Sequence, residues 1–146
     1  MSLSAKVRRA PSRLVTGAFI LNSGIGKWKG DEATAHAIHG MAVGSYPQFA
    51  SMEPKKFLRL LAVGEIAVGV ALLLPIVPAS VAGAALTGFS GSLLKLYWDT
   101  PGMHEPGDPR PTQNGVPVAK DVWMFGSGLG LMLDALLSRD KAAPKT

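Results

Sequence analysis

The sequence predicts an all-α fold, a four-transmembrane-helix bundle that forms a single integral-membrane domain over residues 1–146. The first observation is a long apolar segment, residues 57–98, in which residues 60–94 carry one formal charge, Glu65. A bilayer crossing needs about 20 predominantly apolar helical residues, so this segment holds two crossings. The second observation is composition. Hydrophobic residues make up 47% of the chain and charged residues only 17%, below the roughly 25% that is usual in soluble domains.

The long apolar segment divides into a helical hairpin at Pro75 and Pro78, because helices tend to end just before a proline. Two weaker apolar segments flank this hairpin and complete the bundle. The four expected spans are residues 11–28, 57–74, 78–97 and 122–137.

The second arm of the hairpin carries two rows of small residues at helical spacing. The rows are Gly83, Thr87 and Gly91, and Ala84, Gly88 and Ser92. Lipid tails supply no hydrophobic drive between helices, so membrane spans associate by close approach through small residues. We expect these rows to pack within the bundle, and a dimer face is the alternative.

Two long connections join the spans, and we expect both to be extracytoplasmic. Residues 29–56 contain good helix formers over residues 31–43, and acids in the first turn complement the helix dipole. A short interfacial helix is therefore predicted there. Residues 99–120 contain five prolines, a density that no regular helix or strand survives, so we expect an extended Pro-rich loop.

Charge and tryptophan positions orient the predicted bundle. Four spans place both termini on one side, and the basic residues of both terminal segments place that side in the cytoplasm by the positive-inside rule. Trp28, Trp98 and Trp123 fall at the outward ends of their spans, where they would form an aromatic belt at one interface. We therefore expect a multi-pass plasma-membrane protein with cytoplasmic termini.

The formal net charge of +5 does not indicate a nucleic-acid partner. The basic residues lie at the ends of apolar segments and form no stripe along one helix with aromatic residues between them. The expected partners are the lipid bilayer and either other membrane subunits or further copies of the chain. Cysteine is absent, which excludes disulfides, thiolate metal sites and thiol exchange within this chain.

Glu65 is the strongest candidate for a functional residue. Ionisable groups at membrane depth are costly and mark either function or pairing. Lys27 and Lys95 both lie toward the same outward end and could pair with Glu65. Three roles stay open for Glu65: a structural ion pair, a proton- or quinone-handling carboxylate, and the polar lining of a substrate cavity. Asn22 is a second polar insertion, which we expect to make an interhelical hydrogen bond.

We predict no metal site. His36 and His39 share one face of the expected interfacial helix, and with His104 they could offer imidazole ligands to zinc, iron or copper. Their spacing matches no known two-histidine helical motif, so we expect contacts with water or the outer loops instead. No phosphate loop, dinucleotide fingerprint or nucleophile elbow occurs, and the sequence favours no enzymatic reaction.

Three features are shared with a known family. One is the glycine-containing segment of residues 13–28, which ends in Lys27 and Trp28, and another is residues 61–69 with Glu65 between two glycines. The third is the overall layout, with His104 shortly after the third span. Together they resemble the DoxX-like family of small four-span bacterial membrane proteins. The resemblance implies a bacterial plasma-membrane location and, for some members, a link to quinone-coupled oxidation of sulfur compounds or thiols.

Two functions from different classes are compatible with these patterns. We expect an accessory or assembly subunit of a larger membrane complex, because small-residue rows suit helix association. The alternative is a quinone- or redox-linked membrane protein that uses the intramembrane carboxylate Glu65, with quinone as its cofactor; otherwise no cofactor is predicted. A small-solute transporter is a third alternative, which one buried charge and no visible inverted repeat support only weakly.

Overall fold

A computed structural model describes residues 3–140 of the protein, including the side chains of residues 3–138. The elements are α1 (Leu3–Trp28), α2 (Glu32–Ser45), the 3₁₀ helix η1 (Pro47–Phe49), α3 (Pro54–Leu73), α4 (Ala79–Asp99), α5 (Val116–Ala119) and α6 (Asp121–Asp140). Within residues 3–140 the regular structure is helical throughout, apart from one isolated bridge between His104 and Pro111. The prediction of an all-α fold is confirmed.

The four expected spans correspond to the four long helices α1, α3, α4 and α6. The largest difference is at the start of α1, which begins at Leu3 and continues through Pro11. Its first turns are held against α6, because Arg8 and Arg9 both pair with Asp134. Among the described residues, no helix combines the length and the apolar character needed to cross a membrane.

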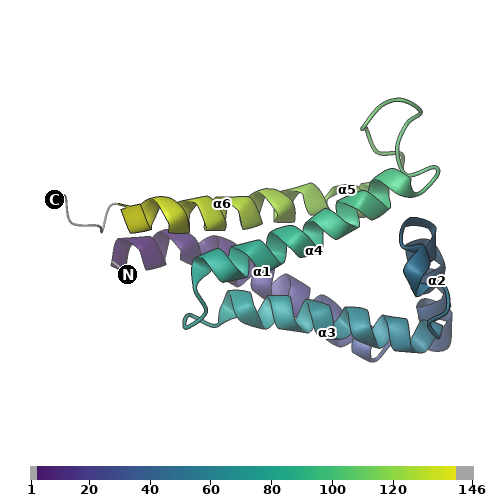
Figure 1. The fold of residues 1–146 in the computed structure, drawn as a ribbon, viewed down its shortest axis with the longest axis horizontal. Coiled ribbons are helices and arrows are strands. Elements are labelled where there is room, and N and C mark those ends of the chain that lie inside the picture. Colours follow the sequence, from purple (N-terminus) through teal and green to yellow (C-terminus); the bar gives the residue numbers. More distant parts are fainter. Residues whose placement is uncertain (1–2, 141–146) are drawn as a thin grey trace.

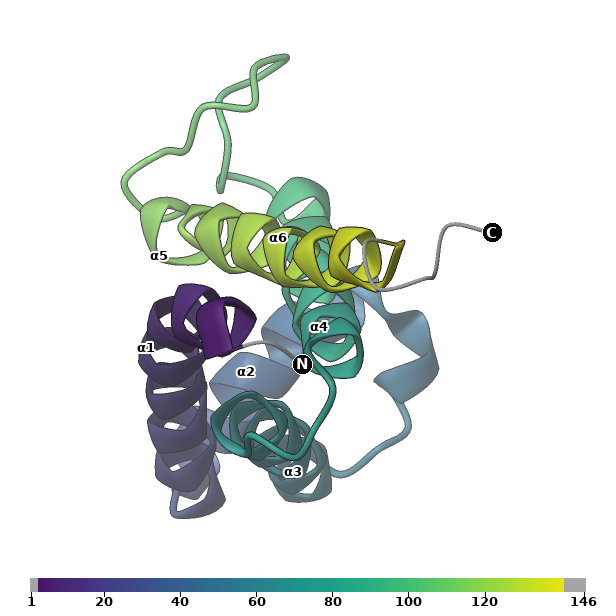
Figure 2. The same ribbon diagram turned by 90° about the vertical axis from the view of Figure 1, so that its left-hand side faces the viewer.

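The long helices form two antiparallel pairs, α1 with α3 and α4 with α6 (Figure 1). The pairs meet at the end where α3 turns into α4, and they diverge toward the other end, where α2 lies across the gap between them (Figures 1 and 2). The α3–α4 turn lies between Leu73 and Ala79, as the two prolines of the hairpin predicted. The wide end therefore leaves room between the pairs.

Glycines allow close packing within each pair. A Cβ added at Gly69 of α3 would lie 2.8 Å from the backbone nitrogen of Leu21 on α1. A Cβ added at Gly83 of α4 would lie 2.7 Å from the carbonyl oxygen of Gly128 on α6. The row that begins at Gly83 thus packs inside the molecule, as expected, whereas Gly88 of the second row is exposed.

Arg13 closes the narrow end of the molecule. Its side chain is buried and donates hydrogen bonds to the carbonyl oxygens of Leu72 (2.7 Å), Val77 (3.0 Å), Ala71 (2.9 Å) and Leu74 (2.7 Å). The last carbonyls of a helix have no partner within it, and a cation near a helix C-terminus is favourable. Arg13 on α1 therefore caps α3 and joins the first helix pair to the turn.

The two connections at the wide end differ in how well the sequence predicted them. The interfacial helix appears as α2, whose N-cap Asp31 accepts a 2.8 Å hydrogen bond from the backbone nitrogen of Thr34. The Pro-rich loop was expected to contain no regular helix, and this was wrong for α5. Pro117 lies in the first turn of α5, where its missing N–H removes no intrahelical hydrogen bond.

Candidate functional site

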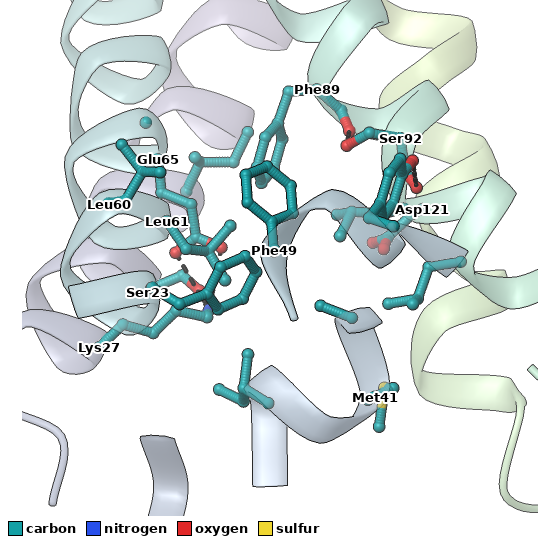
Figure 3. A pocket seen from close by; sticks show the side chains of 18 of the residues that line it. Ser23, Lys27, Met41, Phe49, Leu60, Leu61, Glu65, Phe89, Ser92 and Asp121 are labelled. Carbon is teal, nitrogen blue, oxygen red and sulfur yellow. Dashed lines mark hydrogen bonds and ion pairs between the residues drawn. The ribbon is translucent and has the colours of Figure 1, made fainter. Parts of the chain in front are cut away.

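A cavity of about 700 Å³ lies between the two helix pairs at their wide end. Its walls come from α1, α3, α4 and α6, and α2 with η1 closes the side between the pairs. Most of the lining is apolar or aromatic, and it includes Phe57 together with Phe49 and Phe89, which Figure 3 labels. The polar lining is sparse, which makes each polar group in the wall a candidate for orienting a ligand.

The ion pair between Glu65 and Lys27 forms part of this wall. The ammonium nitrogen of Lys27 on α1 lies 2.9 Å from Oε1 and 3.0 Å from Oε2 of Glu65 on α3. The same nitrogen donates a 2.8 Å hydrogen bond to Ser23 Oγ, one turn back on α1. The Glu65 side chain is only 6% exposed and that of Lys27 is 23% exposed. The structure thus brings two of the predicted site residues together, with Ser23 as a third partner.

Asp121 lines the opposite wall of the same cavity and was not identified from the sequence (Figure 3). It is the first residue of α6 and precedes the expected span of residues 122–137. Burial, together with the charge of Glu65, raises the pKa of Asp121 to about 6, and the charge of Lys27 opposes this shift. Within the described residues its carboxylate has no hydrogen bond or ion pair. The sequence feature that could have identified Asp121 is its position as an acidic residue at the start of an apolar segment.

Lys95, the other candidate partner, does not pair with Glu65. Its ammonium group pairs with Asp99 one turn further along α4 and donates a 3.2 Å hydrogen bond to the carbonyl oxygen of Ser45. It also lies 5.1 Å from the ring centroid of Tyr46. Because the two helix pairs diverge, Lys95 on α4 contacts the end of α2 rather than α3.

Asn22 is exposed on α1 and lies outside the cavity lining. It makes no interhelical hydrogen bond with any residue that the structure describes, so the expected bond was wrong. The next residue, Ser23, lies on the cavity face instead. The polar position that faces the other helices in this part of α1 is therefore Ser23.

The three histidines lie in separate surroundings. His36 is exposed on α2, and His39 Nε2 lies 2.9 Å from the carbonyl oxygen of Phe49. In the second loop, His104 stacks on Trp98 with ring centroids 4.8 Å apart, and its Nε2 lies 3.1 Å from the carbonyl oxygen of Trp98. Over the described part of the chain, no group of three or more His, Cys, Asp or Glu residues could hold a metal ion. His39 instead contacts a backbone carbonyl of η1, and His104 contacts the backbone carbonyls of Trp98 and Glu105.

The segment that closes the cavity is bound to both helix pairs. Tyr46, at the end of α2, donates a 2.9 Å hydrogen bond from its hydroxyl to the carbonyl oxygen of Ser92 on α4. On the other side, the ring of His39 packs edge-on against Phe57 of α3 at 5.4 Å between centroids. The segment of α2 and η1 therefore connects the two helix pairs beside the cavity.

Comparison with known proteins identifies the family of the chain. A family model described as DoxX matches residues 10–94, more than half of the 146 residues, and this range includes Lys27 and Glu65 but not Asp121. Comparisons with curated proteins and with solved structures found no match. The match confirms the resemblance seen in the glycine-containing segments of the first two long helices, and it supports a membrane location. The chain therefore belongs to the DoxX family.

Proposed function

We propose that this DoxX-family protein binds a lipophilic small molecule in the cavity between its two helix pairs. The observation that carries the proposal is the cavity itself, whose apolar walls enclose one buried ion pair. Small-molecule sites are typically about 300–1,000 Å³ and mostly apolar, with a few convergent polar groups. A volume of about 700 Å³ with Glu65, Lys27 and Ser23 at one wall fits that description.

We further propose that the four long helices cross a bacterial plasma membrane with both termini in the cytoplasm. Family membership supports a membrane location, and large apolar side chains point outward from the bundle, as lipid contact requires. Examples are Val15 on α1, Val81 on α4 and Leu133 on α6. In this orientation the wide end, with Trp28, Trp98 and Trp123, lies at the outer interface, and each of these tryptophans is exposed.

A quinone is the ligand that the family resemblance implies. With a quinone as ligand, the protein would be linked to redox chemistry. A quinone ring presents carbonyl acceptors and carries an apolar tail. At the polar wall, the Ser23 hydroxyl accepts a hydrogen bond from Lys27 and keeps its own proton to donate to a quinone carbonyl. The aromatic side chains of the lining would contact the ring and the tail. These features support a quinone as the first ligand to test.

The decisive variant fills the cavity without disturbing helix packing. Gly64 lines the cavity on α3, and a Cβ added there meets nothing within 4 Å. We expect Gly64→Leu to weaken binding of a short-chain quinone analogue at least tenfold, as measured by calorimetric titration of the purified protein. Gly88→Leu is the matched control, because Gly88 is equally unobstructed but lies on the exposed face of α4. Equal binding by the parent protein and by Gly64→Leu, or no binding by either, would contradict the proposal.

Glu65→Gln tests the polar wall separately. It keeps the shape of the side chain but removes the charge that holds Lys27. If the ion pair orients the ligand, the quinone analogue should bind more weakly to Glu65→Gln than to the parent protein. Gly64→Leu should lower the affinity more than Glu65→Gln does. Unchanged affinity in Glu65→Gln would limit the site to its apolar walls.

An assembly role is the second candidate, and the unused row of small residues on α4 favours it. Ala84 and Gly88 are exposed, and nothing in the described structure packs against Gly88. Another membrane subunit or a second copy could approach closely there. Mass measurement in mild detergent tests this: Gly88→Leu should shift an assembled particle to the monomer mass, and Gly64→Leu should not. A strictly monomeric parent with no co-purifying subunit would remove this candidate.

A further inference from the structure

We infer that the cavity selects a lipophilic organic cation over an anion of similar size. A suitable ligand has one ammonium, phosphonium or comparable cationic centre within an apolar or aromatic body. The inference rests on the proposed function, because it assumes that the cavity is a ligand site. It goes further by assigning the charge of the ligand and by giving Asp121, rather than Glu65, the role of binding that charge.

The charge balance of the cavity is the first argument. Its charged lining residues are two carboxylates, Glu65 and Asp121, and one ammonium, Lys27. Lys27 contacts both carboxylate oxygens of Glu65 and the hydroxyl of Ser23, which accounts for the three protons of its ammonium. Asp121 has no compensating partner among the described residues. An ionised cavity therefore carries one excess negative charge, which a cationic ligand would neutralise.

The aromatic lining is the second argument. Phe49 and Phe89 lie between Glu65 and Asp121 in the view of Figure 3, and Tyr46 also lines the cavity. The face of an aromatic ring attracts a cation within about 6 Å of its centroid, and this attraction strengthens when water is excluded. The rings give a cationic ligand favourable contacts that an anion would lack.

The protonation of Asp121 adds a pH dependence to cation binding. The groups that face it across the cavity are Glu65 on α3, which raises its pKa, and Lys27 on α1, which lowers it. In the lining, α2, η1 and α4 contribute no charged group, and the other titratable side chain is Tyr46. Because the pKa of Asp121 is about 6, the carboxylate is mostly ionised at pH 7.5 and mostly neutral at pH 5. Cation affinity should therefore rise as the pH rises through 6.

Isosteric ions of opposite charge test the inference. The probes are tetraphenylphosphonium, tetraphenylborate and the neutral quinone analogue, each titrated by calorimetry at pH 7.5 and pH 5 with protein-free micelles as the blank. We expect the phosphonium to bind at least tenfold more tightly than the borate at pH 7.5. Asp121→Asn should lower phosphonium affinity about tenfold and remove most of its pH dependence. Asp108→Asn, an equal charge change in the exposed loop, should have no effect.

The outcomes separate this inference from the proposed function. If Gly64→Leu weakens quinone binding but Asp121→Asn leaves phosphonium binding unchanged, the cavity is a ligand site and the assignment of its charge preference is wrong. Tighter binding of the borate than of the phosphonium would overturn the inference in the same way. If Gly64→Leu changes the binding of none of the probes, the proposed function fails and the inference fails with it.

Discussion

At the scale of single residues, the buried ion pair between Glu65 and Lys27 is the most informative contact. Removing two charges from water is costly, and the pair offsets that cost only while both partners are present. Glu65 is the more buried partner, and its carboxylate is held by Lys27 alone among the described side chains. The two single substitutions should therefore have unequal effects on stability.

We expect Lys27→Met to destabilise the protein more than Glu65→Gln does. Lys27→Met leaves an unpaired carboxylate in an apolar wall, which costs about 3–5 kcal/mol. Glu65→Gln leaves a partly exposed ammonium that still binds Ser23. Thermal unfolding in detergent checks the order, and the double variant Lys27→Met with Glu65→Gln should recover most of the loss. A double variant that is as unstable as the sum of the singles would show that the pair is not coupled.

Arg13 makes a contact that depends on the shape of its side chain. Its planar fork donates to several carbonyls at the end of α3, whereas an ammonium group has fewer donors and a different geometry. We expect Arg13→Lys to lower the free energy of unfolding by about 3 kcal/mol, since each hydrogen bond to a charged group is worth about 1.5–3 kcal/mol. Arg59→Lys is the control, because Arg59 is exposed and only stacks on Trp28. Similar melting temperatures for both variants would contradict the capping role.

Predictions about single residues succeeded where a chemical rule left few possible partners for a residue. Glu65 is the single charge of a long apolar segment, so the need for a partner was evident, and Lys27 was one of two candidates. Arg13 and Asp121 could not be placed in this way. The partners of Arg13 lie about 60 residues away in sequence, as Leu72 and Val77 show. Asp121 reaches the cavity only because α6 begins opposite α3 across the gap.

At the scale of the elements, glycines divide into those that permit helix contact and those that line open space. Gly69 allows the backbone of α3 to approach Leu21 of α1. At Gly64, which precedes it on the same helix, an added Cβ would have no neighbouring atom within 4 Å. Both occur in one short segment that sequence alone treats as uniform. The spacing of small residues predicted close packing, but the packed and the open faces depend on which helix becomes the neighbour.

We expect Gly69→Ala to destabilise the protein and Gly64→Ala to leave it unchanged or more stable. An added methyl group at Gly69 would press on the backbone of α1, and overpacking of this kind costs about 1–3 kcal/mol. At Gly64 the methyl group has space, and alanine favours the helix by up to about 1 kcal/mol over glycine. Thermal unfolding of both variants checks the difference. Equal destabilisation would mean that the effect arises outside the α1–α3 contact.

The ends of the elements followed local rules, with one exception. Pro75 and Pro78 marked the α3–α4 turn, and acids marked the start of α2 near Asp31. The exception is α5, because Pro117 was taken to exclude a helix, although proline is tolerated in a first turn. Prolines and capping residues thus predicted where helices end. The number of prolines in the loop, by contrast, wrongly predicted that it contains no helix.

At the scale of the whole molecule, the feature that sequence could not supply is the separation of the two helix pairs. Lys95 and Glu65 lie on different helix pairs, and α3 and α4 diverge from their turn (Figure 1). The divergence is maintained by α2, which is bound to α4 through Tyr46 and to α3 through the His39–Phe57 contact. The cavity is therefore a property of the arrangement of the pairs, and each helix alone carries only part of its lining.

The same arrangement makes the proposed topology testable, because the start of α1 and the end of α6 lie at the opposite end of the molecule from α2 (Figure 1). The protein has no cysteine, so single substitutions give an unambiguous label. We expect Ala33→Cys and Gln113→Cys, both at exposed positions near the wide end, to react with a membrane-impermeant maleimide in intact cells. Lys6→Cys, exposed near the start of α1, should react only after permeabilisation, and the parent protein should not react at all. Labelling of Lys6→Cys in intact cells, or the same accessibility for all three variants, would contradict a four-span arrangement with cytoplasmic termini.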